Sequence, residues 1–265
     1  VTTALTIIGA ESAEKFKRLS QDATLPIIYV SRPGEVRTNI HLTDPGTDRL
    51  LKVNQPGPEI SPSTLEHFIL LYRQQLKRAR WVAIGGSLPP GCPPDAYARL
   101  VALARAANVP VLIDTEGEPL LLALREKPTI AKPNLKELRR TLNTPCRTPA
   151  EIRNSLLQIK NLGAQNVIVS DGSKAVFAIE DNIPKNESAV WEVTPPTVKV
   201  IGTTGAGDSL AGGLLAALNK GENFPKALLF GVACASATCA KPEGQFVNRE
   251  EADKLLKRTR IQQHP

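Results

Sequence analysis

The chain places three small residues and one carboxylate directly before an apolar helix, in the segment IGTTGAGDSLAGGLLAALNKG at 201–221. Glycine loses more conformational freedom on folding than any other residue, so a glycine-rich loop has a cost that a function must offset. A glycine loop that opens a helix directs several backbone N–H groups to one point, and the helix N-terminus adds positive potential there. Gly205, Ala206 and Gly207 are therefore predicted to form an anion cradle.

Asp208 would repel a phosphate bound in this cradle, so simple anion binding does not explain it. The carboxylate is understandable if it takes a proton from a hydroxyl while the N–H groups hold the charge on a transferred phosphoryl group. The alternative is a tight turn in which Asp208 caps the helix, which is common on its own. That alternative leaves the three consecutive small residues unexplained. The loop matches neither the Walker A spacing nor the dinucleotide spacing G-x-G-x-x-G.

From residue 61 onward, predicted helices and strands alternate. The predicted helices cover 61–80, 94–108, 135–143, 150–163 and 209–221, and the predicted strands cover 81–86, 109–115, 127–134 and 166–172. This alternation predicts an α/β fold with a mostly parallel sheet covered by helices on both faces. Residues 25–57 differ, because strand-like runs separated by Pro-Gly turns predict antiparallel hairpins there. We expect a single domain over 1–265, with 25–57 inserted as a small β lid.

Composition limits the classes of partner. The 265 residues carry a net charge of +7 with only 4% aromatic residues, and the basic residues are scattered. Nucleic-acid readers concentrate their charge, so we expect no nucleic-acid partner and a mostly solvated basic face. A weaker alternative is that this charge attracts small anions. No apolar run is long enough to span a bilayer, so we expect no membrane partner. Four cysteines without zinc or disulfide spacing favour a reducing, cytoplasmic location.

Five segments, in order, resemble the PfkB (ribokinase-like) carbohydrate kinases, and the resemblance covers the chain essentially from end to end. The last segment is similar to the family signature D-T-x-G-A-G-D. The set resembles the phosphosugar branch of 1-phosphofructokinase, tagatose-6-phosphate kinase and the minor 6-phosphofructokinase. The resemblance implies a ribokinase-like, Rossmann-like α/β fold with a small β lid, and an ATP-dependent kinase. The segments are GGSLPPG at 85–91, LIDTEGEPL at 112–120, KPNLKEL at 132–138, VIVSDGSKAVF at 167–177 and GTTGAGDSLAGGLLAAL at 202–218.

The resemblance also implies roles for single residues. Asp208 corresponds to the catalytic base, and the amides of residues 205–207 correspond to the anion hole. Asn134 and Glu137 match the family's N-x-x-E, which is associated with Mg²⁺ around the ATP phosphates. An amide and a carboxylate one helical turn apart suit a hard cation that keeps its waters, although alone this pattern is more often a solvated helix face. The implied nucleotide-binding residues are Lys132, Ser170, Gly172 and Thr204.

The acceptor site is implied by two segments. VRTN at 36–39 resembles the family's T-R-x-N, so Arg37 is a candidate clamp for the phosphate already on the sugar, with Asn39 beside it. The planar fork of arginine suits that task. Ser87 in GGSLPPG is a second candidate phosphate contact. These residues count against a third hypothesis, a kinase for a nucleoside or an unphosphorylated sugar.

The chain departs from the family pattern at several points. Gly202 stands where the signature begins with Asp, Ala175 replaces a common Gly, and AKPEGQF at 240–246 differs from the usual Asn-containing loop. The last difference puts a K⁺ site in doubt. Family members normally begin with a strand that carries a substrate-binding Asp, followed by a Gly-Gly stretch that grips the sugar hydroxyls. Neither is present, so we expect the chain to be N-terminally incomplete.

Two functions remain open from the sequence. The first is a kinase that transfers the γ-phosphoryl group of ATP, with Mg²⁺ and with K⁺ as a further candidate cation, to a hydroxyl of a phosphorylated hexose. Fructose 1-phosphate, fructose 6-phosphate and tagatose 6-phosphate are the candidate acceptors. The second is a truncated, nucleotide-binding homologue without transfer activity. The resemblance also implies a homodimer formed through the lid.

Overall fold

The computed structural model describes residues 2–21, 25–44, 49–181 and 189–264. The chain divides into two compact units. The first comprises Val1–Arg78 and Ser87–Ala96, and the second comprises Ala79–Gly86 and Tyr97–Pro265. That the two units act as one kinase domain with an inserted lid remains a prediction.

In the first unit, β1 (Ala4–Gly9) and β2 (Ile27–Arg32) form a parallel pair joined through η1 (Ala10–Ser12) and α1 (Ala13–Gln21). A parallel pair needs such a crossover, because the chain must return before the second strand. The prediction that 25–57 consists of antiparallel hairpins is therefore wrong for β2. Helix α2 (Pro62–Leu76) packs against both strands. Its buried side chains recur three or four positions apart: Leu65, Ile69, Tyr72 and Leu76.

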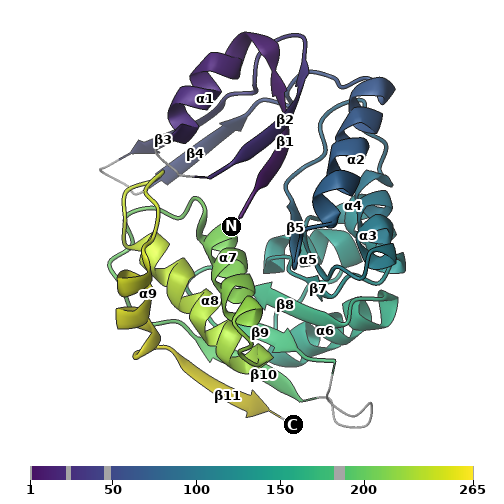
Figure 1. Ribbon diagram of the computed structural model, residues 1–265. Coiled ribbons are helices and arrows are strands. Elements are labelled where there is room, and N and C mark those ends of the chain that lie inside the picture. The colour runs from purple at the N-terminus through teal and green to yellow at the C-terminus, as the bar shows by residue number, and fades with distance from the viewer. Residues whose placement is uncertain (1, 22–24, 45–48, 182–188, 265) are drawn as a thin grey trace. The chain divides into compact units, whose positions relative to one another are not determined.

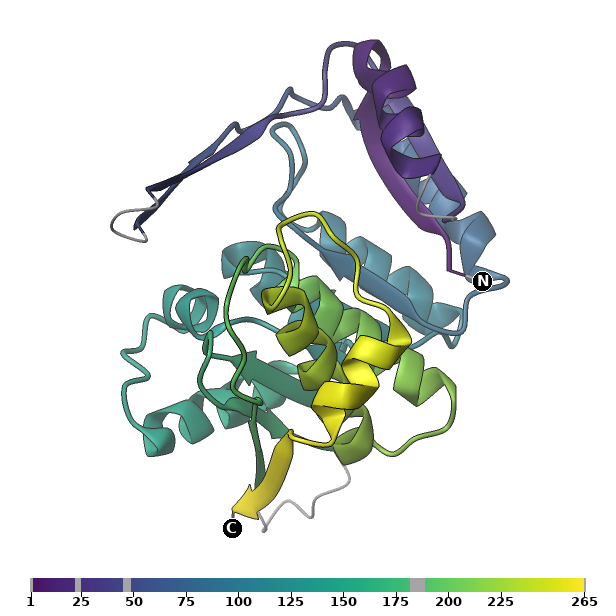
Figure 2. The same cartoon turned by 90° about the vertical axis from the view of Figure 1, so that its left-hand side faces the viewer.

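The remaining part of the predicted lid is an antiparallel hairpin, as expected. It consists of β3 (Asn39–Asp44) and β4 (Arg49–Asn54), which extend away from the β1–β2 pair as a two-stranded arm (Figure 2). Residues 45–48, between the strands, lie outside the described residues. Alternate residues of a strand point to the same side, so the facing pairs Ile40–Val53 and Leu42–Leu51 share one face. All four side chains are exposed, with fractions from 47% to 58%.

The second unit is built on a seven-stranded sheet of described residues, in the order β11-β10-β9-β8-β7-β6-β5 (Figure 1). Strands β5 to β8 are parallel, whereas β9, β10 and β11 are antiparallel to their neighbours. The prediction of a mostly parallel sheet is confirmed for the strands that carry the candidate site. The strands are β5 (Val82–Gly85), β6 (Val111–Asp114), β7 (Ile130–Ala131), β8 (Asn166–Ser170), β9 (Val176–Ile179), β10 (Val190–Thr194) and β11 (Arg260–His264).

Helices cover both faces of this sheet, as predicted. One face packs against α7 (Ala206–Asn219), α8 (Phe224–Cys239) and α9 (Arg249–Leu256), with which it forms a continuous apolar core. Helices that also contact the sheet include α4 (Gly117–Arg125), α5 (Leu135–Leu142) and α6 (Pro149–Leu162). Helix α3 (Ala96–Ala106) connects β5 to β6. Core residues such as Leu112, Ile168 and Leu214 are fully buried in one cluster, in which α7 packs against the sheet.

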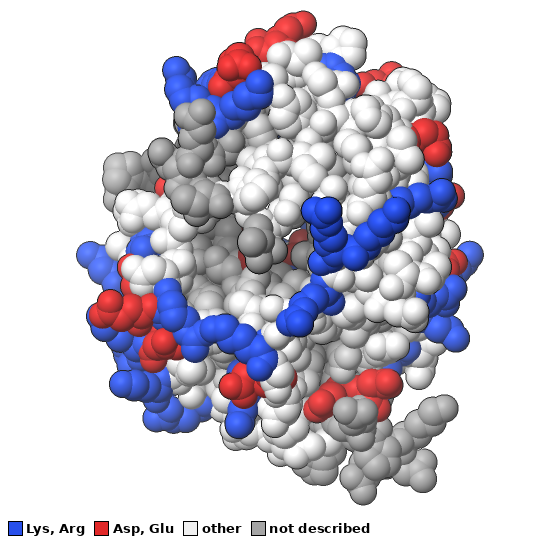
Figure 3. Space-filling view, in the orientation of Figure 1, with Lys and Arg blue, Asp and Glu red and all other residues white. Residues whose placement is uncertain are grey.

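The surface carries mixed charge. Lys and Arg side chains are distributed over many parts of the face drawn in Figure 3, with Asp and Glu side chains among them. On this face the basic side chains are thus not gathered on one element. No helix in the described part of the chain is long and apolar enough to cross a membrane.

Candidate active site

Three of the predicted nucleotide and metal residues meet at the carboxyl edge of the parallel strands. Lys132 directly follows β7, and its backbone N–H donates to Ile113 O of β6 at 2.9 Å. Asn134 forms a parallel bridge with Ser170, the last residue of β8. In open α/β sheets, ligands bind outside the carboxyl ends of the strands. The topology therefore places these side chains where a ligand is expected.

The glycine loop has open space beside it at the start of α7, and within the loop the N–H of Ala206 donates to Thr203 O at 3.3 Å. Gly205 is the residue before α7, and its φ of 81° lies in the left-handed region that favours glycine. A Cβ on Gly205 would meet no atom within 4 Å, so the space beside the loop is open. Asp208 lies in the first turn of α7 and is exposed. The alternative that Asp208 caps the helix is wrong, because the cap position belongs to Gly205.

Lys132 brings a buried positive charge to the same place. Its side chain is only 3% exposed, and its Nζ lies 2.7 Å from Oδ2 of Asp114, the last residue of β6. A Cβ on Gly207 would lie 3.5 Å from this Nζ, so the ammonium group lies beside the first turn of α7. A buried ammonium group needs a partner, and Asp114 supplies it.

Asp114 is a further candidate for this site that was not identified from the sequence. Burial raises the pKa of its carboxyl, the Lys132 charge lowers this pKa, and the Asp208 charge raises it. The carboxylates of Asp114 and Asp208 are thus close enough to interact electrostatically. A signal was present in the sequence, since Asp114 ends a predicted buried strand inside LIDTEGEPL. A carboxylate at the carboxyl end of a parallel strand is a site candidate on that ground alone.

The N-x-x-E pattern forms a complete capping box at the start of α5. Oδ1 of Asn134 accepts from the N–H groups of Lys136 and Glu137, both at 3.0 Å. Oε2 of Glu137 accepts from the N–H of Asn134 at 2.8 Å. Both residues thus have a structural role independent of any ligand. The pKa of the Glu137 carboxyl is raised above its ordinary value, chiefly by burial. The charge of Asp114 raises this pKa further, and the hydrogen bond from the Asn134 N–H lowers it.

Asp114 and Glu137 suit a cation that keeps most of its water ligands better than a cation bound by protein groups alone. Among the described residues, no group of three or more His, Cys, Asp or Glu side chains could hold a metal ion. Mg²⁺ is usually bound through one or two carboxylates together with waters and substrate phosphates. Asp114 and Glu137, which interact electrostatically beside an anion cradle, fit that pattern.

The other predicted nucleotide residues lie on exposed turns of the same unit. Gly172 follows β8 in a tight turn with a φ of 58°. Thr204 lies in the glycine loop, where its Oγ1 donates to Oε1 of Glu243 at 2.8 Å. Their roles toward a nucleotide remain predictions.

In the first unit, the structure brings two predicted phosphate contacts together. Nη1 of Arg37 donates to Oγ of Ser87 at 3.0 Å, although fifty positions separate the two residues. Both side chains are exposed. Asn39 begins β3 two residues later and faces Asn54 across the hairpin. Arg37 and Ser87 therefore form a small polar cluster that could accept an anion.

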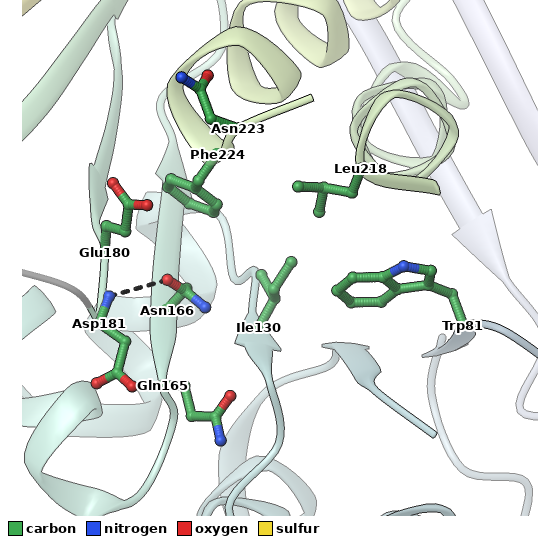
Figure 4. Close-up of a pocket in the computed structure, with 9 residues that line it drawn as sticks. All are labelled: Trp81, Ile130, Gln165, Asn166, Glu180, Asp181, Leu218, Asn223 and Phe224. Atoms are coloured by element: carbon green, nitrogen blue, oxygen red, sulfur yellow. Dashed lines mark hydrogen bonds between the residues drawn. The ribbon is translucent and has the colours of Figure 1, made fainter. Parts of the chain in front are cut away.

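A separate pocket of about 360 Å³ lies in the second unit (Figure 4). It adjoins Ile130 and Asn166, the first residues of β7 and β8, whereas the candidate site lies beyond the last residues of these strands. Trp81, Leu218 and Phe224 form its apolar part. None of the predicted site residues lines it. The other lining residues are Gln165, Glu180, Asp181 and Asn223.

The fold and this sheet edge define an α/β protein with a candidate anion site at the N-terminus of α7. Comparison with known proteins identifies the family: the family model described as "pfkB family carbohydrate kinase" matches residues 1–252. The chain belongs to the PfkB family of carbohydrate kinases. The family resemblance and the α/β fold class predicted from the sequence are both confirmed.

Three relatives illustrate the similarity. A protein from Rhodobacter capsulatus named 1-phosphofructokinase is 33% identical over 216 residues, which are 81% of this chain and 66% of that protein. Phosphofructokinase-2 from Escherichia coli, solved in complex with potassium, is 25% identical with a TM-score of 0.84, covering 96% of this chain and 81% of that one. A possible 1-phosphofructokinase from Thermotoga maritima has a TM-score of 0.86 over all of this chain and 83% of its own, and its 23% identity supports the fold alone.

Proposed function

We propose that this protein is a kinase that transfers the γ-phosphoryl group of ATP to a hydroxyl of a phosphorylated hexose. The observation that carries the proposal is the junction of an open glycine cradle, a buried lysine and an exposed aspartate at the start of α7. Membership of the PfkB family and the similarity to a protein named 1-phosphofructokinase support the same activity. Fructose 1-phosphate, fructose 6-phosphate and tagatose 6-phosphate are the candidate acceptors.

In the proposed reaction, Asp208 is the general base. Its carboxylate takes the proton of the acceptor hydroxyl, and that oxygen bonds to the γ-phosphorus while the bond to the bridging oxygen of ADP breaks. The N–H groups of Gly205, Ala206 and Gly207 hold the charge that develops on the transferred group. Lys132 adds a positive charge at the same point. We further propose that Ser170, Gly172 and Thr204 contact the nucleotide.

Glu137 and Asp114 are the proposed residues for Mg²⁺, which when bound would neutralise charge on the ATP phosphates. Oδ1 of Asn134 accepts hydrogen bonds from two helix N–H groups, so we assign Asn134 the task of holding Glu137 in place through the capping box.

K⁺ stays a candidate second cation, and its omission from the assay buffer tests it. We place the enzyme in the cytoplasm, in keeping with four cysteines that have neither zinc nor disulfide spacing.

The direct test is ADP release by the purified chain with Mg²⁺ and K⁺ against each candidate hexose phosphate. We expect turnover on at least one of them, and we expect it to be lost in Asp208→Asn. Calorimetry with ATP and Mg²⁺ accompanies the assay. Nucleotide binding without turnover on any sugar phosphate would contradict the kinase and favour the nucleotide-binding homologue.

Arg37→Ala is expected to raise KM for the sugar phosphate by about tenfold or more, with KM for ATP nearly unchanged. The reason is that a charge-assisted contact to phosphate contributes about 1.5–3 kcal/mol, and only the acceptor phosphate would lose it. Ser87→Ala should act in the same direction with a smaller effect, because the hydroxyl carries no charge. The measurement is steady-state kinetics with each substrate varied in turn.

Arg73→Ala is the matched control, because it removes the same charge from an exposed position on α2 in the same unit. It should leave both KM values unchanged. Equal increases in both KM values for Arg37→Ala would refute the clamp.

We also propose that a second copy of the chain covers the apolar face of the β3–β4 hairpin. An isolated two-stranded hairpin is at best marginally stable in water, and a contiguous exposed apolar patch marks an interaction site. The E. coli phosphofructokinase-2 has been solved in a tetrameric inhibited form, so self-association occurs in a similar protein. We expect Leu42→Asp and Leu51→Asp to convert a dimer to a monomer in sedimentation velocity.

Leu70→Asp is the control, since this leucine is 55% exposed on α2, outside the hairpin. It should leave the oligomeric state unchanged. A wild-type chain that stays monomeric at all concentrations, or equal dissociation by Leu70→Asp, would count against the hairpin interface.

A further inference from the structure

Two unexplained departures from the family pattern meet in space beside the glycine loop. The first is Gly202, where the signature begins with Asp, and the second is the segment AKPEGQF at 240–246. The N–H groups of Ile201 and Gly202 both donate to Cys239 O at the end of α8, at 2.8 and 3.3 Å. The 240–246 segment follows at once, and the side chain of Glu243 lies against the start of the glycine loop.

Gly202 is required by space and not by backbone conformation. Its φ is outside the left-handed region, so another residue could adopt the same backbone. However, a Cβ at this position would lie 2.8 Å from Cγ of Glu243 and 3.1 Å from Lys241 O. Contacts this short force a neighbour to move. The stem of Glu243 thus occupies the space that a side chain at position 202 would need.

Glu243 reaches through this space to a residue of the glycine loop. Its Oε1 accepts a hydrogen bond from Oγ1 of Thr204 at 2.8 Å, and Thr204 directly precedes Gly205. A hydrogen bond to an ionised carboxylate is among the stronger kinds. Glu243 therefore connects the 240–246 segment to the loop that supplies the anion hole.

The 240–246 segment also forms contacts with α9, through Lys241. Nζ of Lys241 donates to Phe246 O at 2.8 Å and lies 2.8 Å from Oε2 of Glu251. Glu251 belongs to the capping box that begins α9, together with Asn248. The segment is thus anchored to α9, and its position does not depend on the glycine loop alone.

We infer that Glu243 is a positioning residue for the anion hole and that Gly202 is small in order to admit it. By holding Thr204, Glu243 fixes the direction of the N–H groups of residues 205–207. The inference rests on the proposed kinase function for its effect on turnover. The contact between residues 202 and 243 stands independently of that function.

A double-mutant cycle tests the inference. Gly202→Ala should displace Glu243, and Glu243→Ala should release Thr204, so each should lower kcat by roughly 10- to 100-fold, the cost of a small misplacement at a catalytic centre. The double variant should be no slower than the slower single variant, because both remove the same contact. KM for both substrates should change less than kcat, since the anion hole acts on the transition state. Glu243→Gln keeps an acceptor for Thr204 and should retain most of the turnover.

Matched controls separate this contact from general disturbance. Gly212→Ala makes the same change inside α7, where a Cβ would meet no atom within 4 Å, and Glu250→Ala removes an exposed carboxylate from α9. Both should keep wild-type turnover. Independent, multiplicative losses for Gly202→Ala and Glu243→Ala, or full turnover in Glu243→Ala, would overturn the positioning role.

Thermal unfolding distinguishes failure of this inference from failure of the proposed function. A wild-type chain without turnover contradicts the kinase, yet the same four chains can still be compared by Tm. Coupled Tm changes at 202 and 243 would support the contact in that case. Additive Tm changes would overturn it.

Discussion

Asp208→Asn is expected to lower kcat by roughly 10²–10⁴-fold, the usual contribution of a general base. The amide cannot take the hydroxyl proton, while the backbone of the cradle is unchanged. Asp208 does not cap α7, so its replacement should leave the helix start and the thermal stability nearly intact. Steady-state kinetics with the best acceptor and calorimetry with ATP and Mg²⁺ measure the two effects separately.

Asp253→Asn provides the matched control for this experiment. Asp253 is an aspartate of the same unit whose Oδ2 lies 2.9 Å from Nε of Arg249, at the surface of α9. Its replacement should leave kcat unchanged. Near-full turnover in Asp208→Asn would remove Asp208 from the role of base, whatever the control shows.

Lys132→Met is expected to lower kcat by about 10²–10³-fold, comparable with the loss of one donor from an oxyanion hole. The ammonium group lies beside the first turn of α7, where charge would develop during transfer. The same change leaves the Asp114 carboxylate without its buried partner. Breaking a buried ion pair in this way costs about 3 kcal/mol or more of the free energy of unfolding. Urea unfolding and steady-state kinetics check the two effects.

A second substitution separates the catalytic effect from the structural one. Adding Asp114→Asn to Lys132→Met removes the unpaired carboxylate, so stability should recover while kcat stays low. Because Asp114 is itself a proposed Mg²⁺ residue, the single variant Asp114→Asn is measured beside it, and kcat of the double variant should lie below that of this single variant. The loss of stability in Lys132→Met should also depend on pH. Burial raises the pKa of Asp114 in the folded state, so its carboxyl favours folding at low pH and disfavours it as pH rises through that pKa. We therefore expect Lys132→Met to lower the free energy of unfolding less at pH 5 than at pH 8. Recovery of turnover in the double variant would contradict the catalytic role of Lys132.

Much of the candidate site could be predicted because local sequence dictates local geometry. A run of small residues before an apolar helix specifies an open helix N-terminus, so residues 205–207 and Asp208 were identified from spacing alone. Alternating strand and helix segments predicted the parallel sheet, because parallel strands need crossover connections. The family segments then supplied Lys132, Ser170 and Arg37, which no local pattern distinguishes from surface or core residues.

Tertiary structure decided how these residues work together. The pairing of Lys132 with Asp114 depends on the neighbouring positions of β6 and β7, and the contact of Arg37 with Ser87 joins segments fifty positions apart. The parallel pairing of β2 with β1 overrode the Pro-Gly turns that had predicted a hairpin. The N-x-x-E pattern specifies a capping box locally, and only burial beside Asp114 makes Glu137 a candidate for a cation.

Gly202 shows the same division most clearly. The sequence determined that the position departs from the family signature, and it could not say why. The reason lies in Glu243, forty-one residues further along the chain, whose stem fills the space of the missing side chain. Sequence determines what each residue can do chemically and which local backbone it favours. Close approach between distant segments depends on how the whole core packs, and only the folded chain decides it.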